Sequence, residues 1–158
     1  MTEEKETMQQ CMIHPTAIID PQAKIGAGVK IGPYAVIGPH VTIGDGTEIM
    51  AHVVIDGWTT IGKNCRFFPS ASIGSEPQDL KFKGEKSYVI IGDRSVFREY
   101  VTVSRATGEG EETRIGSDCL FQACTHVAHN CIIGNHVIMS NCAGLAGHVI
   151  VEDRVVIG

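Results

Sequence analysis

Residues 25–44 read IGAGVKIGPYAVIGPHVTIG, and in this stretch an Ile-Gly pair returns every six residues. Across the chain the pair begins at ten positions that share one six-residue frame, namely Ile25, Ile31, Ile37, Ile43, Ile61, Ile73, Ile91, Ile115, Ile133 and Ile157. Apolar residues without a following glycine, such as Phe67 and Leu145, keep the same frame. A pattern that holds one phase over the whole sequence indicates a repeat protein.

A second set of residues lies four places after each of these positions and is small or β-branched. It includes Ala35, Val41, Thr47, Cys65, Cys119 and Val137. Each hexad therefore offers one large and one small inward side chain. A six-residue period fits neither the α-helix nor the heptad, but it is typical of a parallel β-helix. We therefore predict an all-β fold with three hexads in a triangular coil of about 18 residues, stacked ~4.8 Å apart, and we expect the glycines to help the wall turn.

Two segments leave the frame. Residues 75–89 read SEPQDLKFKGEKSYV and residues 106–113 read ATGEGEET, and we expect both to be loops expelled from the β-helix wall. Functional sites concentrate on loops held by a rigid scaffold. The remaining organisation is a polar head over residues 1–12 and a β-helix over residues 13–158, still in phase at its last pair, which predicts that the natural chain continues.

Composition narrows the class of protein. The chain has 158 residues, a formal net charge of −5, 43% hydrophobic residues and no apolar run of the ~18–20 residues that a membrane helix needs. The acidic balance argues against nucleic acid as the main partner. The opening MTEEKETMQQ lacks the features of a secretory signal, and six cysteines without one suit a reducing compartment. We therefore expect a cytoplasmic protein without an integral membrane segment.

Histidine is the residue type that points to chemistry. The stretch His126-Val-Ala-His129-Asn130 places two histidines on consecutive hexads, and His148 follows His129 by 19 residues, one more than a coil of 18. The spacing predicts that three imidazoles converge on one part of the wall. Such a group fits a general base with neighbours that position a substrate, or a metal held by imidazoles. Incidental polar corners of the coil are the third interpretation.

Several stretches of the sequence resemble one known family. They are IHPTAIIDPQAKIGAGVKIGP at residues 13–33, QDLKFKGE at 78–85, IGDRSVFREYVTVSR at 91–105, HVAHNCIIGN at 126–135 and NCAGLAGHV at 141–149. Together they are similar to the UDP-N-acetylglucosamine O-acyltransferases that begin lipid A synthesis, over residues 13–158. The resemblance implies a left-handed parallel β-helix, assembly as a homotrimer with clefts between neighbours, and a helical C-terminal domain that is absent from this chain.

The resemblance also implies the reaction. Members of the family transfer a 3-hydroxyacyl chain from acyl carrier protein to the 3-hydroxyl of UDP-N-acetylglucosamine. They need no cofactor of their own, since the donor carries its acyl chain on a phosphopantetheine arm. By match to the family's motifs, His129 is the catalytic base and Gly147 supplies a backbone N–H to the developing oxyanion.

The other matched positions bind substrate. His148 and Asp79 correspond to residues that hold the sugar, and His126, Lys81 and Gln78 to residues that line the cleft. Asn130 departs from the family, in which many members have Asp after the base. An amide cannot supply a negative charge, so we expect either lower activity or a transfer of the orienting role to a backbone group.

Two alternatives remain open from the sequence. One is a zinc lyase on the same fold, similar to γ-type carbonic anhydrases, with His126, His129 and His148 as ligands shared across a trimer. The other is that this chain is only a trimeric β-helical scaffold without activity.

Overall fold

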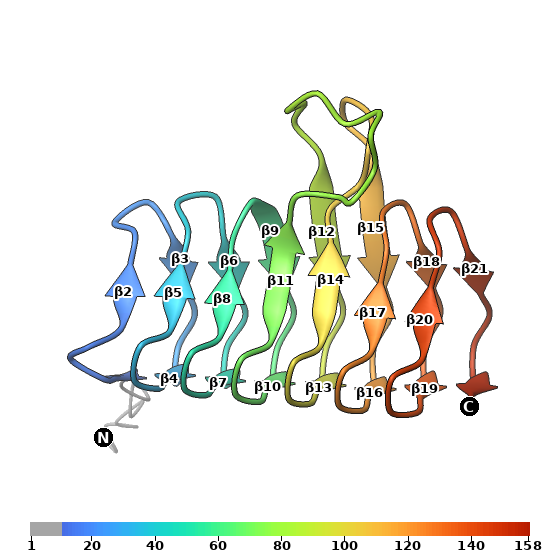
Figure 1. The fold of residues 1–158 in the computed structure, drawn as a ribbon. Helices are drawn as coiled ribbons and strands as arrows, with labels where there is room; N and C mark the ends of the chain where they lie inside the picture. Colours follow the sequence, from blue (N-terminus) through green and yellow to red (C-terminus); the bar gives the residue numbers. More distant parts are fainter. Residues whose placement is uncertain (1–10) are drawn as a thin grey trace, which may run out of the picture.

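The computed structural model describes residues 11–158, which form 22 short strands wound into a triangular prism (Figure 1). Sheet A has eight strands: β1 (Met12–Ile13), β4 (Lys30–Ile31), β7 (Glu48–Ile49), β10 (Arg66–Phe67), β13 (Val96–Phe97), β16 (Leu120–Phe121), β19 (Ile138–Met139) and β22 (Val156–Ile157). Sheet B has seven: β2 (Ile18–Ile19), β5 (Val36–Ile37), β8 (Val54–Ile55), β11 (Ser72–Ser75), β14 (Thr102–Ser104), β17 (His126–Val127) and β20 (Gly144–Leu145). Sheet C also has seven: β3 (Lys24–Ile25), β6 (Thr42–Ile43), β9 (Trp58–Ile61), β12 (Tyr88–Ile91), β15 (Glu112–Ile115), β18 (Ile132–Ile133) and β21 (Ile150–Val151).

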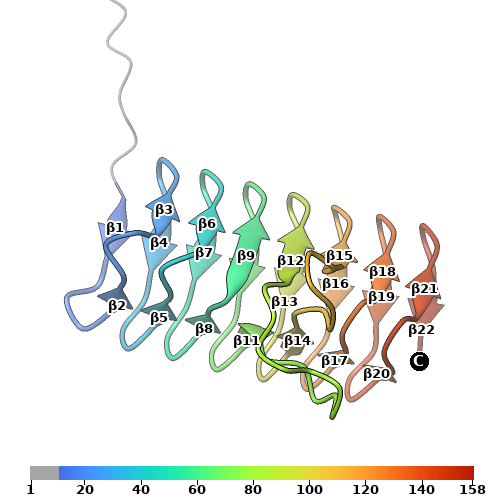
Figure 2. The same ribbon diagram turned by 90° about the horizontal axis from the view of Figure 1, so that it is seen from above.

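Every strand pairs in parallel with its counterpart in the next coil, so each sheet runs the length of the prism (Figure 2). In the regular coils the partners are three hexads apart, as in the pair Met12 and Lys30. The two loops change this spacing, because Trp58 pairs with Tyr88, five hexads on, and Tyr88 pairs with Glu112, four hexads on. The first loop therefore adds two hexads and the second adds one. Because both additions are whole hexads, the six-residue frame keeps its phase throughout.

The loops are slightly different from those expected from the sequence. The segments between strands are 76–87 and 105–111, whereas the sequence predicted 75–89 and 106–113. The first loop is shorter because Ser75 pairs with Ser104, and because Tyr88 and Val89 extend β12. The four-residue strands β11 and β12 therefore hold the two ends of the first loop in sheets B and C.

The core contains the two inward positions of each hexad. Large residues such as Ile37 and small ones such as Thr47 and Cys65 are almost fully buried. Three phenylalanines, Phe67, Phe97 and Phe121, stack in successive coils with ring centroids 4.8 Å apart and planes nearly parallel. The predicted large-and-small pattern is therefore correct.

The role expected for the glycines after isoleucine is wrong in one respect. Of these glycines, Gly74 alone has a positive φ, and the left-handed corner positions are occupied mainly by other residues, such as Asn64 and His136. What the glycines provide is close approach. A Cβ on Gly44 would lie 2.5 Å from the carbonyl oxygen of Gly62 in the next coil, so a side chain there would force the coils apart.

Of the expected polar head over residues 1–12, only Cys11 and Met12 lie within the described residues. Met12 begins β1. Within residues 11–158 there is no helix with the length and apolar character needed to span a membrane.

The phenylalanine stack gives a test of the core. Phe97→Ala removes the middle ring and leaves a cavity between two coils, so we expect the free energy of unfolding to fall by about 3–5 kcal/mol. The matched control is Ile150→Ala at a side chain that is 74% exposed, which should change stability by less than about 0.5 kcal/mol. Urea unfolding of both variants measures the difference, and equal losses would contradict this packing.

Candidate functional site

The candidate site lies at the prism edge between sheets B and C. Both loops leave the wall at this edge and stand side by side, and the 76–87 loop leans toward β17 (Figures 1 and 2). His129 lies in the turn that follows β17, and His148 lies in the equivalent turn after β20. The fold therefore brings two turns and two loops to one place.

His129 packs directly against the next coil. Its ring meets that of His148 edge to face, with centroids 5.1 Å apart, and the His148 N–H donates to the carbonyl of His129 (3.0 Å). A Cβ on Gly147 would collide with the His129 imidazole, so only glycine allows the backbone to come this close. The structure thus brings His129 and His148 together, as their spacing predicted, and it places Gly147 against the same imidazole.

Asp79 reaches this pair from the 76–87 loop. Its Oδ2 lies 3.8 Å from Nε2 of His129, and each side chain is only 16% exposed. The Lys81 N–H donates to Asp79 Oδ1 (3.0 Å), and this bond is the main cause of an Asp79 pKa below its ordinary value, with His129 adding a smaller effect in the same direction. Asp79 is therefore a carboxylate at neutral pH, directed at the outer nitrogen of His129.

Asn130 joins His129 to the second loop. Its Oδ1 accepts the Thr107 N–H (2.9 Å), its Nδ2 donates to the Thr107 carbonyl (3.1 Å), and its own N–H donates to Thr113 Oγ1 (2.9 Å). The two bonds to Thr107 fix which way the amide points. Oδ1 also lies 2.9 Å from Nδ1 of His129, and because Oδ1 can only accept, Nδ1 must carry the proton. In the neutral ring Nε2 then has the free lone pair.

This geometry answers the question raised by the departure at Asn130. The sequence suggested lower activity or a transfer of the orienting role to a backbone group, but Asn130 itself makes the orienting hydrogen bond. Sequence reasoning missed Thr107, whose backbone fixes the amide, because the 105–111 loop has no six-residue frame from which to place it.

The remaining predicted residues lie around this centre. His126 is the outward-facing residue of β17. Its Nδ1 and Thr102 Oγ1 are joined by a hydrogen bond (2.7 Å), and partial burial lowers the pKa of its imidazole. Gln78 and Lys81 are exposed on the loop. The predicted convergence of three imidazoles therefore holds for His129 and His148, while His126 bonds to Thr102. Among the residues that the structure describes, no three His, Cys, Asp or Glu side chains of one chain are grouped as metal ligands would be.

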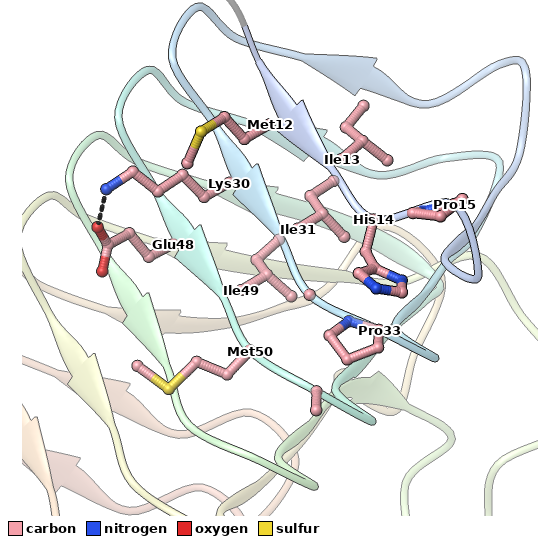
Figure 3. Close-up of a pocket in the computed structure, with 12 residues that line it drawn as sticks. Met12, Ile13, His14, Pro15, Lys30, Ile31, Pro33, Glu48, Ile49 and Met50 are labelled. Carbon is pink, nitrogen blue, oxygen red and sulfur yellow. Dashed lines mark hydrogen bonds and ion pairs between the residues drawn. The ribbon is translucent and has the colours of Figure 1, made fainter.

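A separate hollow of about 720 Å³ lies over the outer face of β1, β4 and β7 (Figure 3). Lys30 and Glu48 at its rim pair with each other (2.6 Å). His14, which also lines it, bonds through Nδ1 to Thr16. None of the candidate residues lines this hollow, and its polar groups are already partnered.

Two family models match the chain. One, described as the GMPPB C-terminal domain, matches residues 8–108, and the other, described as the bacterial transferase hexapeptide with six repeats, matches residues 112–147. A curated relative from Thermodesulfovibrio yellowstonii is 53% identical over 142 residues, which are 89% of this chain and 55% of the relative. That relative is named acyl-[acyl-carrier-protein]–UDP-N-acetylglucosamine O-acyltransferase. The chain thus spans about half the length of this relative.

Solved structures give the same result. The enzyme LpxA from Acinetobacter baumannii superposes with a TM-score of 0.91 at 49% identity, over 93% of this chain and 57% of that one. A structure described as UDP-N-acetylglucosamine acyltransferase superposes with a TM-score of 0.90 at 45% identity, over 92% of this chain and 57% of that one. These matches confirm the expected left-handed parallel β-helix.

The amide network at Asn130 can be tested without substrate. Asn130→Ala removes the acceptor of the Thr107 N–H, so that amide should exchange with solvent faster, and stability should fall by about 1–3 kcal/mol. Asn130→Asp keeps the acceptor oxygen and loses only the donor to the Thr107 carbonyl, so its effect should be smaller. Hydrogen exchange measured by NMR distinguishes the two, and unchanged Thr107 exchange in Asn130→Ala would contradict the network.

Proposed function

This chain belongs to the UDP-N-acetylglucosamine O-acyltransferase family of hexapeptide-repeat proteins, and on that premise we propose that its protein transfers a 3-hydroxyacyl chain from acyl carrier protein to the 3-hydroxyl of UDP-N-acetylglucosamine. This reaction is the first step of lipid A synthesis. The observation that carries the proposal is His129, whose Nδ1 is held by Asn130 and whose Nε2 is left free beside Asp79.

The reaction uses these groups in turn. Nε2 of His129 takes the proton of the sugar 3-hydroxyl while that oxygen attacks the thioester carbonyl of the donor. The Gly147 N–H, which donates no hydrogen bond within the described residues, stabilises the negative charge that develops on the carbonyl oxygen. The tetrahedral intermediate then expels the phosphopantetheine sulfur, which receives the proton from Nε2. No cofactor of the protein itself takes part in this scheme.

Asp79 has two roles in this scheme. Its charge stabilises the imidazolium of His129 once the proton has moved, and together with His148 it holds the sugar. Lys81, Gln78 and His126 line the cleft. Because burial lowers the pKa of His126, this side chain is neutral at neutral pH and contacts substrate as a hydrogen-bonding group.

We also propose that the protein is a homotrimer in the cytoplasm. The outer face of sheet B, on which His126 lies, carries an apolar row of Ile18, Val36 and Val54, which are 66%, 36% and 37% exposed. This apolar row on β2, β5 and β8 lies on the same face as His126, with β11 and β14 between them, and a contiguous exposed apolar row supports contact with a neighbouring subunit. The six free thiols of the described residues suit a reducing compartment, and the net charge of −5 argues against nucleic acid as a partner.

The role of His129 is tested in the complete natural protein. His129→Ala should lower kcat by about 10²–10⁴, because the general base is lost. The matched control is His136→Ala, which removes a histidine with a left-handed backbone on another edge of the prism and should leave kcat unchanged. The assay follows transfer from hydroxyacyl carrier protein to UDP-N-acetylglucosamine, and product analysis should find an ester.

Three results would argue against this function. An amide product would place the protein with N-acyltransferases, and stoichiometric zinc that activity requires would favour the lyase. A trimer in sedimentation without any turnover would leave the scaffold interpretation.

The pH dependence tests the part played by Asn130. A carboxylate in its place favours the protonated imidazole, so in Asn130→Asp the acidic limb of the kcat/KM profile should move to higher pH by about 1 unit. Asn64→Asp, at another left-handed corner, is the control and should leave the profile unchanged. A profile of Asn130→Asp that coincides with the wild-type profile would mean that residue 130 does not act on the base.

A further inference from the structure

Arg105 is buried at the point where the 76–87 loop leaves the wall. Its side chain is 10% exposed. Its backbone N–H donates to the carbonyl of Ser75 (3.0 Å), and Nη1 donates to the carbonyl of Gly74 (3.3 Å). Arg105 thus belongs to the second loop and binds the last two residues of β11, the strand from which the 76–87 loop leaves.

The guanidinium also contacts two aromatic rings. Its Cζ is 5.0 Å from the ring centroid of Phe82, in the middle of the 76–87 loop, and 6.0 Å from that of Trp58 in β9. A Cβ on Gly57 would lie 3.3 Å from Nη1, so the bare glycine gives the guanidinium its space. Arg105 therefore connects the wall, the start of the loop and its middle.

The positive charge of Arg105 is compensated mainly by one exposed carboxylate. The hollow beside it is lined by Asp56 and Glu76, and the nearest carboxylate oxygen, of Glu76, is 3.5 Å from Nη2 on a side chain that is 73% exposed. Nε is buried and has no partner within the described residues. Burying a charge with so little compensation is costly, and two acidic neighbours oppose an anionic ligand. The other contacts described for this side chain are the Gly74 carbonyl and the rings of Phe82 and Trp58.

Phe82 is directly linked to Asp79. The Phe82 N–H donates to the Asp79 carbonyl (3.0 Å), and the Lys81 N–H donates to the Asp79 carboxylate, so residues 79–82 form one tight turn. A shift of the Phe82 ring would therefore move the carboxylate that faces His129 at 3.8 Å. Small displacements of a reacting group are enough to lower rates about 10²-fold.

We propose that Arg105 is a positioning residue, which holds Phe82 and the start of the 76–87 loop so that the Asp79 carboxylate stays against Nε2 of His129. Its value for catalysis rests on the function proposed above. The planar guanidinium of an arginine suits this task better than the ammonium of a lysine, because its face can stack on an aromatic ring while its edge donates to carbonyl oxygens.

A double-mutant cycle in the complete natural protein tests the link to Asp79. Arg105→Met should lower kcat/KM for UDP-N-acetylglucosamine about 10- to 100-fold. In an Asp79→Asn background the same change should have little further effect, because the two residues act through one contact. Effects that multiply independently would overturn the proposal.

The matched control is Arg98→Met. Arg98 also stacks on a phenylalanine, with Cζ 4.4 Å from the ring centroid of Phe68, and pairs with Glu99, but it lies in the turn after β13 rather than beside the loop. Its loss should leave kcat/KM unchanged. Arg105→Lys keeps the charge but loses the planar face, so it should lower kcat/KM by a smaller factor than Arg105→Met. It replaces Arg105→Met in the experiment if that variant does not fold.

A second measurement needs no activity. Hydrogen exchange of the Lys81 and Phe82 amides, whose acceptors belong to Asp79, should be at least about tenfold faster in Arg105→Met than in wild type or Arg98→Met. Unchanged exchange would refute the positioning role, whatever the enzyme does. If the complete protein transfers no acyl chain but these amides are released, the proposed function fails and the structural link stands.

Discussion

Parallel pairing between like positions of successive coils is the constraint on which the rest of this structure depends. Each residue lies above its counterpart one coil earlier, so a core side chain meets the same class of side chain on both sides, as in the row of Phe67, Phe97 and Phe121. Stability is then spread along the prism as contacts between neighbouring coils. The same pairing sets the close approach of backbones that glycines such as Gly44 allow.

The site follows from that constraint. Pairing places the turns that contain His129 and His148 in successive coils at one edge, where the histidines meet. Because each loop adds whole hexads, the strands on either side of it keep their pairing. Residues of the loops, which lie outside the six-residue frame, can therefore lie at the same edge. Asp79 faces the outer nitrogen of His129 from one loop, and Thr107 fixes Asn130 from the other. A rigid scaffold thus carries His129, the proposed base, while one loop fixes the proton on Nδ1 through Asn130 and the other places a carboxylate beside Nε2.

The sequence predicts what the frame governs. The β-helix, its inward positions and the meeting of His129 with His148 all follow from counting residues, because one coil has a fixed length. The six-residue frame gives no information inside an expelled loop. It therefore could not predict that Asp79 faces His129, or that Arg105 contacts Phe82 and the end of β11. It also places His126 on the correct coil without showing that its side chain bonds to Thr102. At Asn130 the sequence indicates a lost charge, whereas the orienting amide depends on a loop that has no frame.

The proposed mechanism requires that neutral His129 carries its proton on Nδ1 and keeps Nε2 free to act as a base. The most direct measurement is ¹⁵N NMR of the imidazole nitrogens of His129 at a pH where the ring is neutral. We expect a protonated Nδ1 and an unprotonated Nε2, with the difference reduced in Asn130→Ala. A proton found on Nε2, or shared equally between the two nitrogens, would contradict it.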